Sequence, residues 1–290
     1  MNKVEFNQLL KKGPVILDGA TGSVLRTMGM QPGTCSEIWI NEHPDLLKKL
    51  QKDYAEAGSM VVYAPTFLAN RFSLASMGLE SEVKRLNLEN VKISKEAVEG
   101  KAFVAGNLST TSQPMEPFGT MTYDKLLDIY KEQISYLCEA GVDYLAAETL
   151  MSLEEAMVLC DAAASECSLP LTLSFTCEGD GNLYFGGSIV EAAVVLQEMG
   201  AAAVGINCSV GPDQLEAVVK NLKENLDIPV LAKPNAGVPK IDEHGQAHYS
   251  MDEDTFAKCM KRLYECGASV IGGCCGTSPA YIKKMCDALG

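Results

Sequence analysis

A strand-like apolar run ends in a pair of cysteines at Ser269-Val270-Ile271-Gly272-Gly273-Cys274-Cys275-Gly276-Thr277, and a shorter run ends in one cysteine at Ala203-Val204-Gly205-Ile206-Asn207-Cys208. Adjacent residues of a regular strand point to opposite faces, so Cys274 and Cys275 would diverge on one. Glycine stands on both sides of the pair and allows the backbone to turn there. The sequence therefore predicts three thiolates that converge at strand ends without an obvious fourth ligand, which is typical of an open, catalytic zinc site.

Strand-like and helical patterns alternate along the chain, with no long linker between them. Eight runs are predicted as strands: Val15–Asp18, Met60–Thr66, Phe103–Asn107, Tyr144–Glu148, Leu171–Thr176, Ala203–Cys208, Val230–Asn235 and Ser269–Cys274. Helical patterns lie between them, for example Asp45–Ala57, Tyr123–Ala140, Gln214–Asn225 and Asp252–Cys266. This alternation predicts an α/β fold, a single (β/α)8 TIM barrel over residues 1–290, with its active site at the C-terminal ends of the strands.

Glycine recurs where a helical pattern gives way to the next strand, as Gly58, Gly141, Gly200 and Gly267. A left-handed glycine just past a helix end is the expected cap at such a junction. The alternative architecture is an open, doubly wound sheet, which normally carries a Gly-rich dinucleotide-binding turn after its first strand. Gly19-Ala20-Thr21-Gly22 does not match that fingerprint, so the barrel is favoured.

Composition narrows the class of function. The chain has 290 residues, 47% of them hydrophobic, which is enough for one large domain. Its net charge of −14 argues against nucleic acid and anionic membranes as partners, since both require a basic surface. No run is long enough for a membrane span, and the first residues, Met1–Phe6, do not resemble a signal peptide. We therefore expect a cytoplasmic protein whose scattered cysteines are mostly small buried side chains.

Polar side chains stand at nearly every predicted strand end, and in a barrel these ends meet at one mouth. Two of them, Asp18 and Glu148, would place carboxylates near a zinc centre and suit a cationic group such as an α-amino group. The alternative is that Asp18 makes a turn and Glu148 caps the following helix. The strand-end residues are Asp18-Gly19-Ala20-Thr21-Gly22, Thr66, Asn107, Glu148-Thr149, Asn207-Cys208, Asn235 and the pair Cys274-Cys275.

Five stretches of the chain are distinctive: Leu17-Asp18-Gly19-Ala20-Thr21-Gly22, Tyr63-Ala64-Pro65-Thr66-Phe67-Leu68-Ala69-Asn70-Arg71, Gly205-Ile206-Asn207-Cys208, Pro234-Asn235-Ala236-Gly237-Val238-Pro239 and Gly272-Gly273-Cys274-Cys275-Gly276-Thr277. In these stretches the chain resembles the zinc-dependent homocysteine S-methyltransferase family, and within it the homocysteine-binding domain of cobalamin-dependent methionine synthase. Because the stretches run from residue 17 to residue 277, the resemblance covers essentially the whole chain.

The resemblance implies a catalytic zinc ion bound by Cys208, Cys274 and Cys275, with Asn235 in the fourth position until substrate arrives. Zinc lowers the pKa of a bound thiol, so homocysteine would bind as a thiolate near neutral pH. That thiolate would attack the methyl group of an activated donor and form methionine. The implied enzyme is a homocysteine S-methyltransferase.

The same resemblance implies a substrate site around this centre. Asp18 and Glu148 would hold the amino group of homocysteine, and Thr66 with the backbone after Asp18 would contact its carboxylate or stem. The predicted substrate-binding residues are Asp18, Gly19, Ala20, Thr21, Thr66, Glu148 and Asn207.

Two stretches of the sequence bear on the methyl donor. The stretch Asp242-Glu243-His244-Gly245-Gln246-Ala247 approaches the cobalamin-binding pattern D-x-H-x-x-G but ends in alanine, so we interpret it as a turn. The Tyr63–Arg71 stretch favours methylcobalamin carried by a separate corrinoid protein. The alternative is a small donor such as S-methylmethionine or a betaine.

Two hypotheses from other classes are left open. A zinc-binding barrel without turnover would explain the cysteines but not two carboxylates at the same mouth. A phosphate-binding barrel enzyme would use Gly272-Gly273 and Gly276-Thr277 as an anion cradle, with the cysteine pair as a coincidence.

Overall fold

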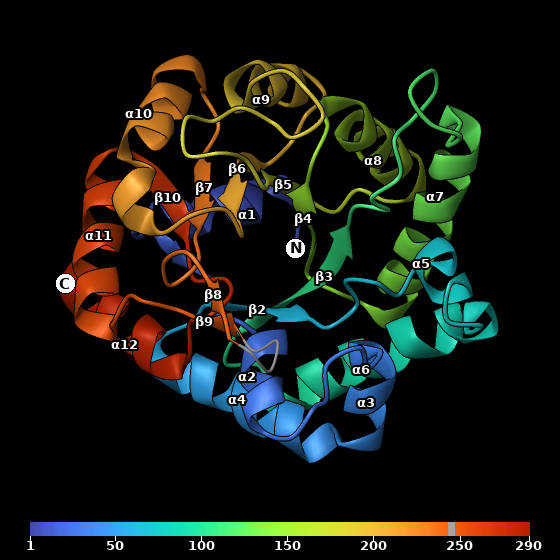
Figure 1. Ribbon diagram of the computed structural model, residues 1–290, viewed down its shortest axis with the longest axis horizontal. Coiled ribbons are helices and arrows are strands. Elements are labelled where there is room, and N and C mark those ends of the chain that lie inside the picture. The colour runs from blue at the N-terminus through green and yellow to red at the C-terminus, as the bar shows by residue number, and fades with distance from the viewer. Residues whose placement is uncertain (243–246) are drawn as a thin grey trace.

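Eight parallel strands form the centre of the molecule in a computed structural model that describes residues 1–242 and 247–290. Their bounds are β1 Val15–Ile16, β2 Val61–Ala64, β3 Phe103–Ser109, β4 Tyr144–Leu150, β5 Leu171–Phe175, β6 Ala203–Asn207, β7 Val230–Lys233 and β10 Ala268–Ile271. They pair in the order β1-β10-β7-β6-β5-β4-β3-β2. A parallel bridge from Leu17 to Val61 brings the two ends of this order together. The predicted TIM barrel is therefore confirmed (Figure 1).

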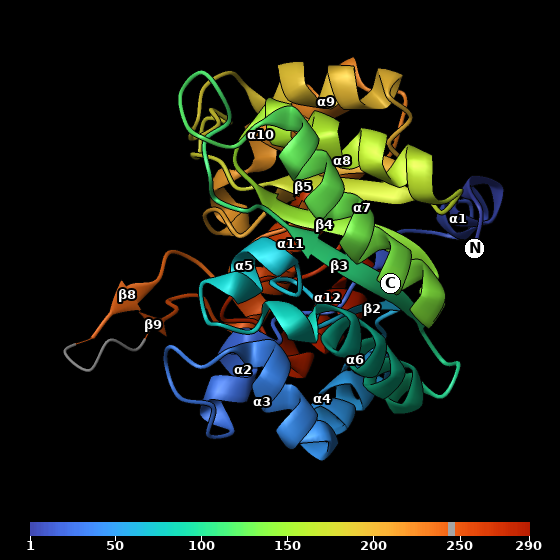
Figure 2. The same cartoon turned by 90° about the vertical axis from the view of Figure 1, so that its right-hand side faces the viewer.

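Helices surround the strands and follow them in alternation (Figures 1 and 2). The α-helices are α1 Lys3–Leu10, α2 Gly22–Thr27, α3 Ser36–Glu42, α4 Pro44–Ala57, α5 Arg71–Ala75, α6 Val83–Val98, α7 Tyr123–Ala140, α8 Leu153–Glu166, α9 Ile189–Glu198, α10 Glu216–Asn225, α11 Glu253–Glu265 and α12 Pro279–Leu289. Two short 3-10 helices are η1 Glu80–Glu82 and η2 Pro212–Gln214.

The predicted boundaries differ from the observed ones where the local chemistry changes. The seventh strand ends at Lys233 rather than Asn235, because Pro234 has no N–H to donate to the sheet. The helix expected over Gln214–Asn225 is divided, with η2 ending at Gln214 and α10 starting at Glu216. All eight predicted strands and the helix Tyr123–Ala140 are nevertheless confirmed.

The glycines at the helix-to-strand junctions adopt the backbone conformation that the repeat predicts. Gly58 and Gly141 cap α4 and α7 in the left-handed region, with φ of 114° and 74°. Gly200 and Gly267 also have positive φ, 88° and 115°. A residue with a Cβ is strained in this region, so glycine allows each helix to end and the next strand to begin at once.

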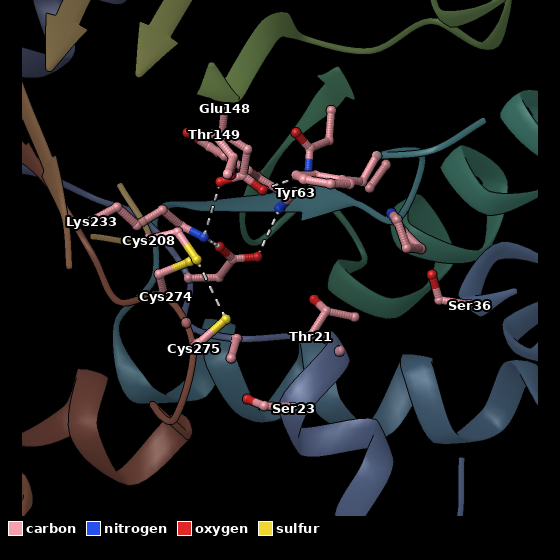
Figure 3. A pocket seen from close by; sticks show the side chains of 18 of the residues that line it. Thr21, Ser23, Ser36, Tyr63, Glu148, Thr149, Cys208, Lys233, Cys274 and Cys275 are labelled. Atoms are coloured by element: carbon pink, nitrogen blue, oxygen red, sulfur yellow. Dashed lines mark hydrogen bonds and ion pairs between the residues drawn. The ribbon is translucent and has the colours of Figure 1, made fainter. Parts of the chain in front are cut away.

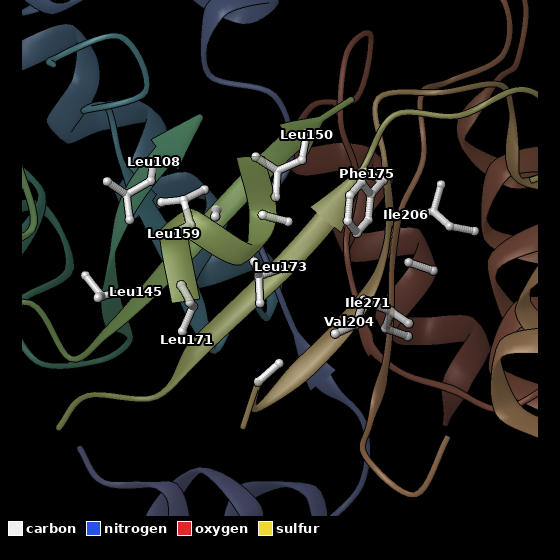
Figure 4. Packing of buried hydrophobic residues seen from close by; sticks show 14 of the residues in the cluster. Leu108, Leu145, Leu150, Leu159, Leu171, Leu173, Phe175, Val204, Ile206 and Ile271 are labelled. Carbon is white, nitrogen blue, oxygen red and sulfur yellow. The ribbon is translucent and has the colours of Figure 1, made fainter. Parts of the chain in front are cut away.

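Side chains of the strands alternate between two apolar layers. One layer lies between the strands and the outer helices, for example where Leu171 and Leu173 of β5 lie beside Leu159 of α8 (Figure 4). The other fills the barrel interior, and α1 closes its N-terminal end by packing Phe6 edge-on against Tyr144, with ring centroids 5.6 Å apart. Full burial of such a side chain stabilises the fold by about 1.5–3 kcal/mol. This plugged end leaves the opposite end for the site.

A two-stranded hairpin extends beyond the barrel between β7 and α11, with β8 at Lys240–Ile241 and β9 at Ala247–His248 (Figure 2). The stretch Asp242–Ala247 that we interpreted as a turn includes residues 243–246, which lie outside the described part of the chain. In the residues that the structure covers, the helices are all too short or too polar to cross a membrane.

Candidate active site

A cavity of about 270 Å³ opens at the C-terminal ends of the strands (Figure 3). Its polar walls come from β4, β7 and the turns after β1, β6 and β10, so residues far apart in sequence meet there. The lining residues are Asp18, Gly19, Ala20, Thr21, Gly22, Ser23, Ser36, Glu37, Ile40, Tyr63, Ala64, Pro65, Phe67, Asn107, Glu148, Thr149, Cys208, Lys233, Cys274 and Cys275.

The three predicted cysteines converge in this cavity. Their sulfur atoms lie within 4.8 Å of one another, and Cys208 Sγ is 3.6 Å from Cys275 Sγ. A tetrahedral zinc ion with bonds of about 2.3 Å to sulfur needs sulfur atoms about 3.8 Å apart, so the cluster fits such an ion. In the described part of the chain, no other group of three or more His, Cys, Asp or Glu side chains is close enough to hold a metal ion.

Glycine brings the adjacent cysteines to one point, as the sequence predicts. A Cβ on Gly272 would lie 2.7 Å from the Asp18 carbonyl oxygen, and one on Gly273 would overlap the Thr277 hydroxyl group. Only a residue without a side chain therefore lets the chain after β10 pass so close to the end of β1. The Cys274 N–H then donates to the Pro234 carbonyl at 2.8 Å, which fixes the pair beside β7.

The thiols of the cluster differ in pKa. Hydrogen bonds from Cys208 and Cys274 lower the pKa of the Cys275 thiol to about 3, because they stabilise its thiolate. The same contacts with Cys274 and Cys275 raise the pKa of Cys208. Without a cation the cluster therefore favours one thiolate, and a divalent cation is the group that would allow all three to ionise.

The two predicted carboxylates both face the cavity and are fully or almost fully buried. Tyr63 N–H donates to Asp18 Oδ2 and Asn107 Nδ2 donates to Glu148 Oε1, each at 2.8 Å. Glu148 does not cap the following helix, because Ser152 does so. Asp18 does not only make a turn, because its carboxylate accepts a hydrogen bond from the neighbouring strand β2. Burial raises the pKa of Asp18 to about 6, and burial also raises the pKa of Glu148.

Lys233 is a member of the site that the sequence analysis missed. Its ammonium lies 3.4 Å from Asp18 Oδ1 and 3.7 Å from Glu148 Oε2 (Figure 3). Burial alone would lower its pKa, but the facing carboxylates outweigh this effect and raise it. A lysine inside an apolar strand run is unusual, and that was the signal available in the sequence.

Three predicted residues are not among those that line the cavity. Thr66 is buried between β2 and β3, where its hydroxyl donates to the Asn107 carbonyl at 2.8 Å and accepts from the Asn107 N–H. Asn207 holds Thr149 with two hydrogen bonds, one to its backbone and one to its hydroxyl. Asn235 Nδ2 donates to Ser209, while its buried Oδ1 has no hydrogen-bond partner.

The backbone after Asp18 lines the cavity, as predicted, and is itself held in place. Ala20 N–H donates to Thr277 Oγ1 at 3.2 Å, and the Tyr54 hydroxyl donates to the Ala20 carbonyl at 2.8 Å. A Cβ on Gly19 would lie 2.7 Å from that hydroxyl oxygen, so glycine is needed for this close approach. Thr21 completes this wall.

A TIM barrel whose mouth brings together a cysteine cluster and buried carboxylates defines the class: an α/β-barrel enzyme with its site at the strand ends. Residues 15–289 match the homocysteine S-methyltransferase family, and the chain belongs to that family. This membership confirms the resemblance seen in the sequence and the expected enzyme class, a methyltransferase.

Similar proteins are known in sequence and in structure. The methionine synthases of Mycobacterium tuberculosis and Mycobacterium leprae are 26% and 27% identical over 299 and 300 residues, which cover 97% of this chain. The chain spans about a quarter of the length of these relatives, 25% of each. The metallated form of the Escherichia coli homocysteine methyltransferase MmuM superposes with a TM-score of 0.80 at 22% identity, covering 98% of this chain and 99% of that one. At this identity the superposition supports the fold.

Proposed function

We propose that this chain transfers a methyl group to the thiol of homocysteine, which it binds at a zinc ion held by Cys208, Cys274 and Cys275. The observation that carries the proposal is the meeting of three sulfurs within 4.8 Å with two buried carboxylates in one cavity. A metal-binding barrel without turnover would need the cysteines but not the carboxylates. A phosphate site is disfavoured, since the two carboxylates outnumber the one lysine beside them and would repel a ligand that carries only negative charge.

The cysteines and Asn235 are the proposed zinc ligands. When bound, zinc supplies a Lewis acid that lowers the pKa of a coordinated thiol. The orphaned Asn235 Oδ1 lies on the segment that pairs with the cysteine pair, through a hydrogen bond of 3.0 Å from Ala236 N–H to the Cys275 carbonyl. This oxygen is the proposed fourth ligand in the absence of substrate.

The protein's own residues position the acceptor for reaction. Asp18 and Glu148 hold its ammonium group, and the backbone from Gly19 to Thr21 bounds its stem. Asn207 and Thr66 act from behind, by fixing Thr149 and Asn107 on the cavity wall. The acceptor thiolate then attacks the methyl carbon, and a sulfur–carbon bond forms as the carbon–donor bond breaks with its electron pair leaving on the donor.

The proposed donor is a methylcorrinoid carried outside these 290 residues. The Tyr63–Arg71 stretch supports this donor, and the similarity to proteins named methionine synthase supports methionine as the product. The alternative donor is a small molecule such as S-methylmethionine or a betaine. The cytoplasmic location remains a prediction, which cell fractionation would test.

The decisive experiment is a methyl-transfer assay with homocysteine and four donors: methylcobalamin, S-methylmethionine, glycine betaine and S-adenosylmethionine. We expect methionine to form with one class of donor and only in zinc-containing protein. No methionine with any donor would contradict the proposed activity.

A further inference from the structure

The buried ammonium of Lys233 lies in the place where the acceptor's ammonium was expected. It faces Asp18 at 3.4 Å and Glu148 at 3.7 Å, and it lies 4.7 Å from the centroid of the Tyr63 ring. Two carboxylates and one lysine leave this part of the cavity with one negative charge in excess. A substrate cation is therefore still attracted, but it does not meet an empty pair of carboxylates.

The alternation of β7 fixes this lysine in the cavity. Leu231 belongs to the interior layer of the barrel, while Val230 and Ala232 belong to the outer layer. Lys233 comes two residues after Leu231 and points the same way, so its stem lies along the barrel interior and its ammonium reaches the mouth. The side chain is 5% exposed.

The two carboxylates keep unused acceptor capacity beside Lys233. Asp18 Oδ1 and Glu148 Oε2 are buried and make no hydrogen bond, although their other oxygens are bonded. The lysine approaches both at distances longer than those of strong charge-assisted hydrogen bonds. Buried acceptors of this kind usually have a partner, so a further donor is expected at this point.

The acceptor's carboxylate also needs a partner of opposite charge. Among the described residues that line the cavity, Lys233 is the one basic side chain. Of the backbone amides after Asp18, the Ala20 N–H already donates to Thr277 Oγ1 and is not free for that carboxylate. A carboxylate that is buried without a partner loses its hydration and gains no interaction that offsets this loss.

We propose that Lys233 binds the carboxylate of the thiol acceptor, while Asp18 Oδ1 and Glu148 Oε2 bind its ammonium. The amino and carboxyl groups of an α-amino acid are attached to one carbon, and a cation and two anions 3.4 and 3.7 Å apart match that arrangement. Lys233 thus makes the site specific for a zwitterionic amino acid. This inference rests on the proposed function and adds a specificity-determining residue to it.

The test compares three thiols by isothermal titration calorimetry on the protein as purified: homocysteine, decarboxylated homocysteine and deaminated homocysteine. Lys233→Met should weaken binding of the two thiols that carry a carboxylate by about tenfold to a hundredfold, because a charged hydrogen bond is lost. It should leave decarboxylated homocysteine unchanged or bound more tightly. Lys220→Met, at an exposed lysine of α10, is the matched control and should change none of the three.

Two results would overturn the assignment. Equal changes for all three thiols would mean that Lys233 only shapes the cavity, and tighter binding of homocysteine would mean that the lysine competes with the substrate ammonium. If Lys233→Met does not fold, the unaltered protein should still bind homocysteine at least about tenfold more tightly than its carboxamide. Equal affinity for the two would also overturn it. Binding constants decide the role of Lys233, whereas the proposed function fails if bound homocysteine is not methylated.

Discussion

Cys208 combines two unusual properties at one residue. Its φ of 47° lies in the left-handed region, which few residues other than glycine adopt, and its sulfur lies 3.6 Å from that of Cys275. Thr149, which also lines the cavity, has a φ of 64°. Such conformations cost about 1–3 kcal/mol each and occur mostly where a site requires them. Thr149 N–H donates to Asn207 Oδ1 and Asn207 Nδ2 donates to the Thr149 hydroxyl, and these two bonds hold Thr149 in its conformation.

The first prediction concerns the metal. The purified protein should contain about one zinc per chain, as one tetrahedral site implies. Cys208→Ser, Cys274→Ser and Cys275→Ser should each lower the zinc content and abolish methyl transfer, because serine is a poor zinc ligand. Elemental analysis measures this, with Cys266→Ser as a control that keeps its zinc. Full zinc occupancy in any two of the three variants would contradict the assignment.

The second prediction concerns the carboxylates. Asp18→Asn and Glu148→Gln should keep zinc bound but raise the KM for homocysteine about tenfold to a hundredfold, since each removes a charge that faces the ammonium. Deaminated homocysteine should be almost indifferent to both changes. Steady-state kinetics with the two thiols measures the difference. Unchanged homocysteine kinetics in both variants would give these carboxylates another role.

The third prediction follows from the raised pKa of Asp18, about 6 instead of 3.8. A carboxyl with a raised pKa loses its charge as the pH falls through that value. We therefore expect the ratio of the affinity for homocysteine to the affinity for deaminated homocysteine to be constant above about pH 7. The ratio should decrease as the pH falls below that value. The ratio cancels the ionisation that both thiols share. In Asp18→Asn the part of the decrease centred near pH 6 should disappear, and what is left would belong to Glu148, whose pKa burial also raises. An unchanged decrease near pH 6 in this variant would contradict the assignment to Asp18.

At the scale of secondary structure, one glycine sets the spacing of the strands that carry the cysteine and the lysine. Gly205 in β6 is paired with Leu231 in β7, and a Cβ on Gly205 would overlap the Leu231 backbone. Cys208 follows Gly205 on one strand, and Lys233 follows Leu231 on the other. The close contact of these two strands therefore places a thiol and an ammonium at the same mouth.

The fourth prediction tests this strand contact. Gly205→Ala should lower the free energy of unfolding by about 1–3 kcal/mol, because the added methyl group forces β6 and β7 apart. It should also reduce the zinc content, since Cys208 moves with β6. Urea unfolding and elemental analysis measure the two effects. The control is Gly22→Ala, where no atom lies within 4 Å of the added Cβ. Equal stability of both variants would contradict the argument.

At the scale of the whole molecule, the barrel brings its reactive groups from the two ends of the chain to one opening. Asp18 follows the first strand and the cysteine pair follows the last, and the two meet because the barrel closes. The other end is plugged by α1. A methyl donor therefore has to reach the cavity from the side of the βα loops, whether it is a small molecule or a cofactor on a protein.

The fifth prediction concerns that donor. Free methylcobalamin should support slow turnover, and a methylated corrinoid protein from the same organism should support much faster turnover, because contacts between proteins orient the methyl group. A transient contact of this kind should be weak, with a Kd on the order of micromolar. The reaction is followed by comparing the loss of the cobalt–methyl absorption band with the amount of methionine formed. Efficient transfer from S-methylmethionine, with none from either corrinoid, would identify a small donor instead.

The sequence by itself determined the barrel and its reactive end. Alternation of apolar runs and helical patterns, with glycine at each junction, depends only on local periodicity and backbone freedom, so it can be read without a structure. The cysteines and the two carboxylates were predictable for the same reason, since they directly follow apolar runs. The identification of the fold then placed them at one mouth.

Only the tertiary structure decided how these residues interact. Lys233 lies within an apolar run, and its pairing with Asp18 and Glu148 depends on three strands that are distant in sequence. Likewise, Thr66 and Asn207 lie at the ends of predicted strands, but their side chains are hydrogen-bonded to Asn107 and Thr149 and do not line the cavity. Burial and long-range pairing determine which polar groups stay free for a ligand, and both exist only once the barrel has closed.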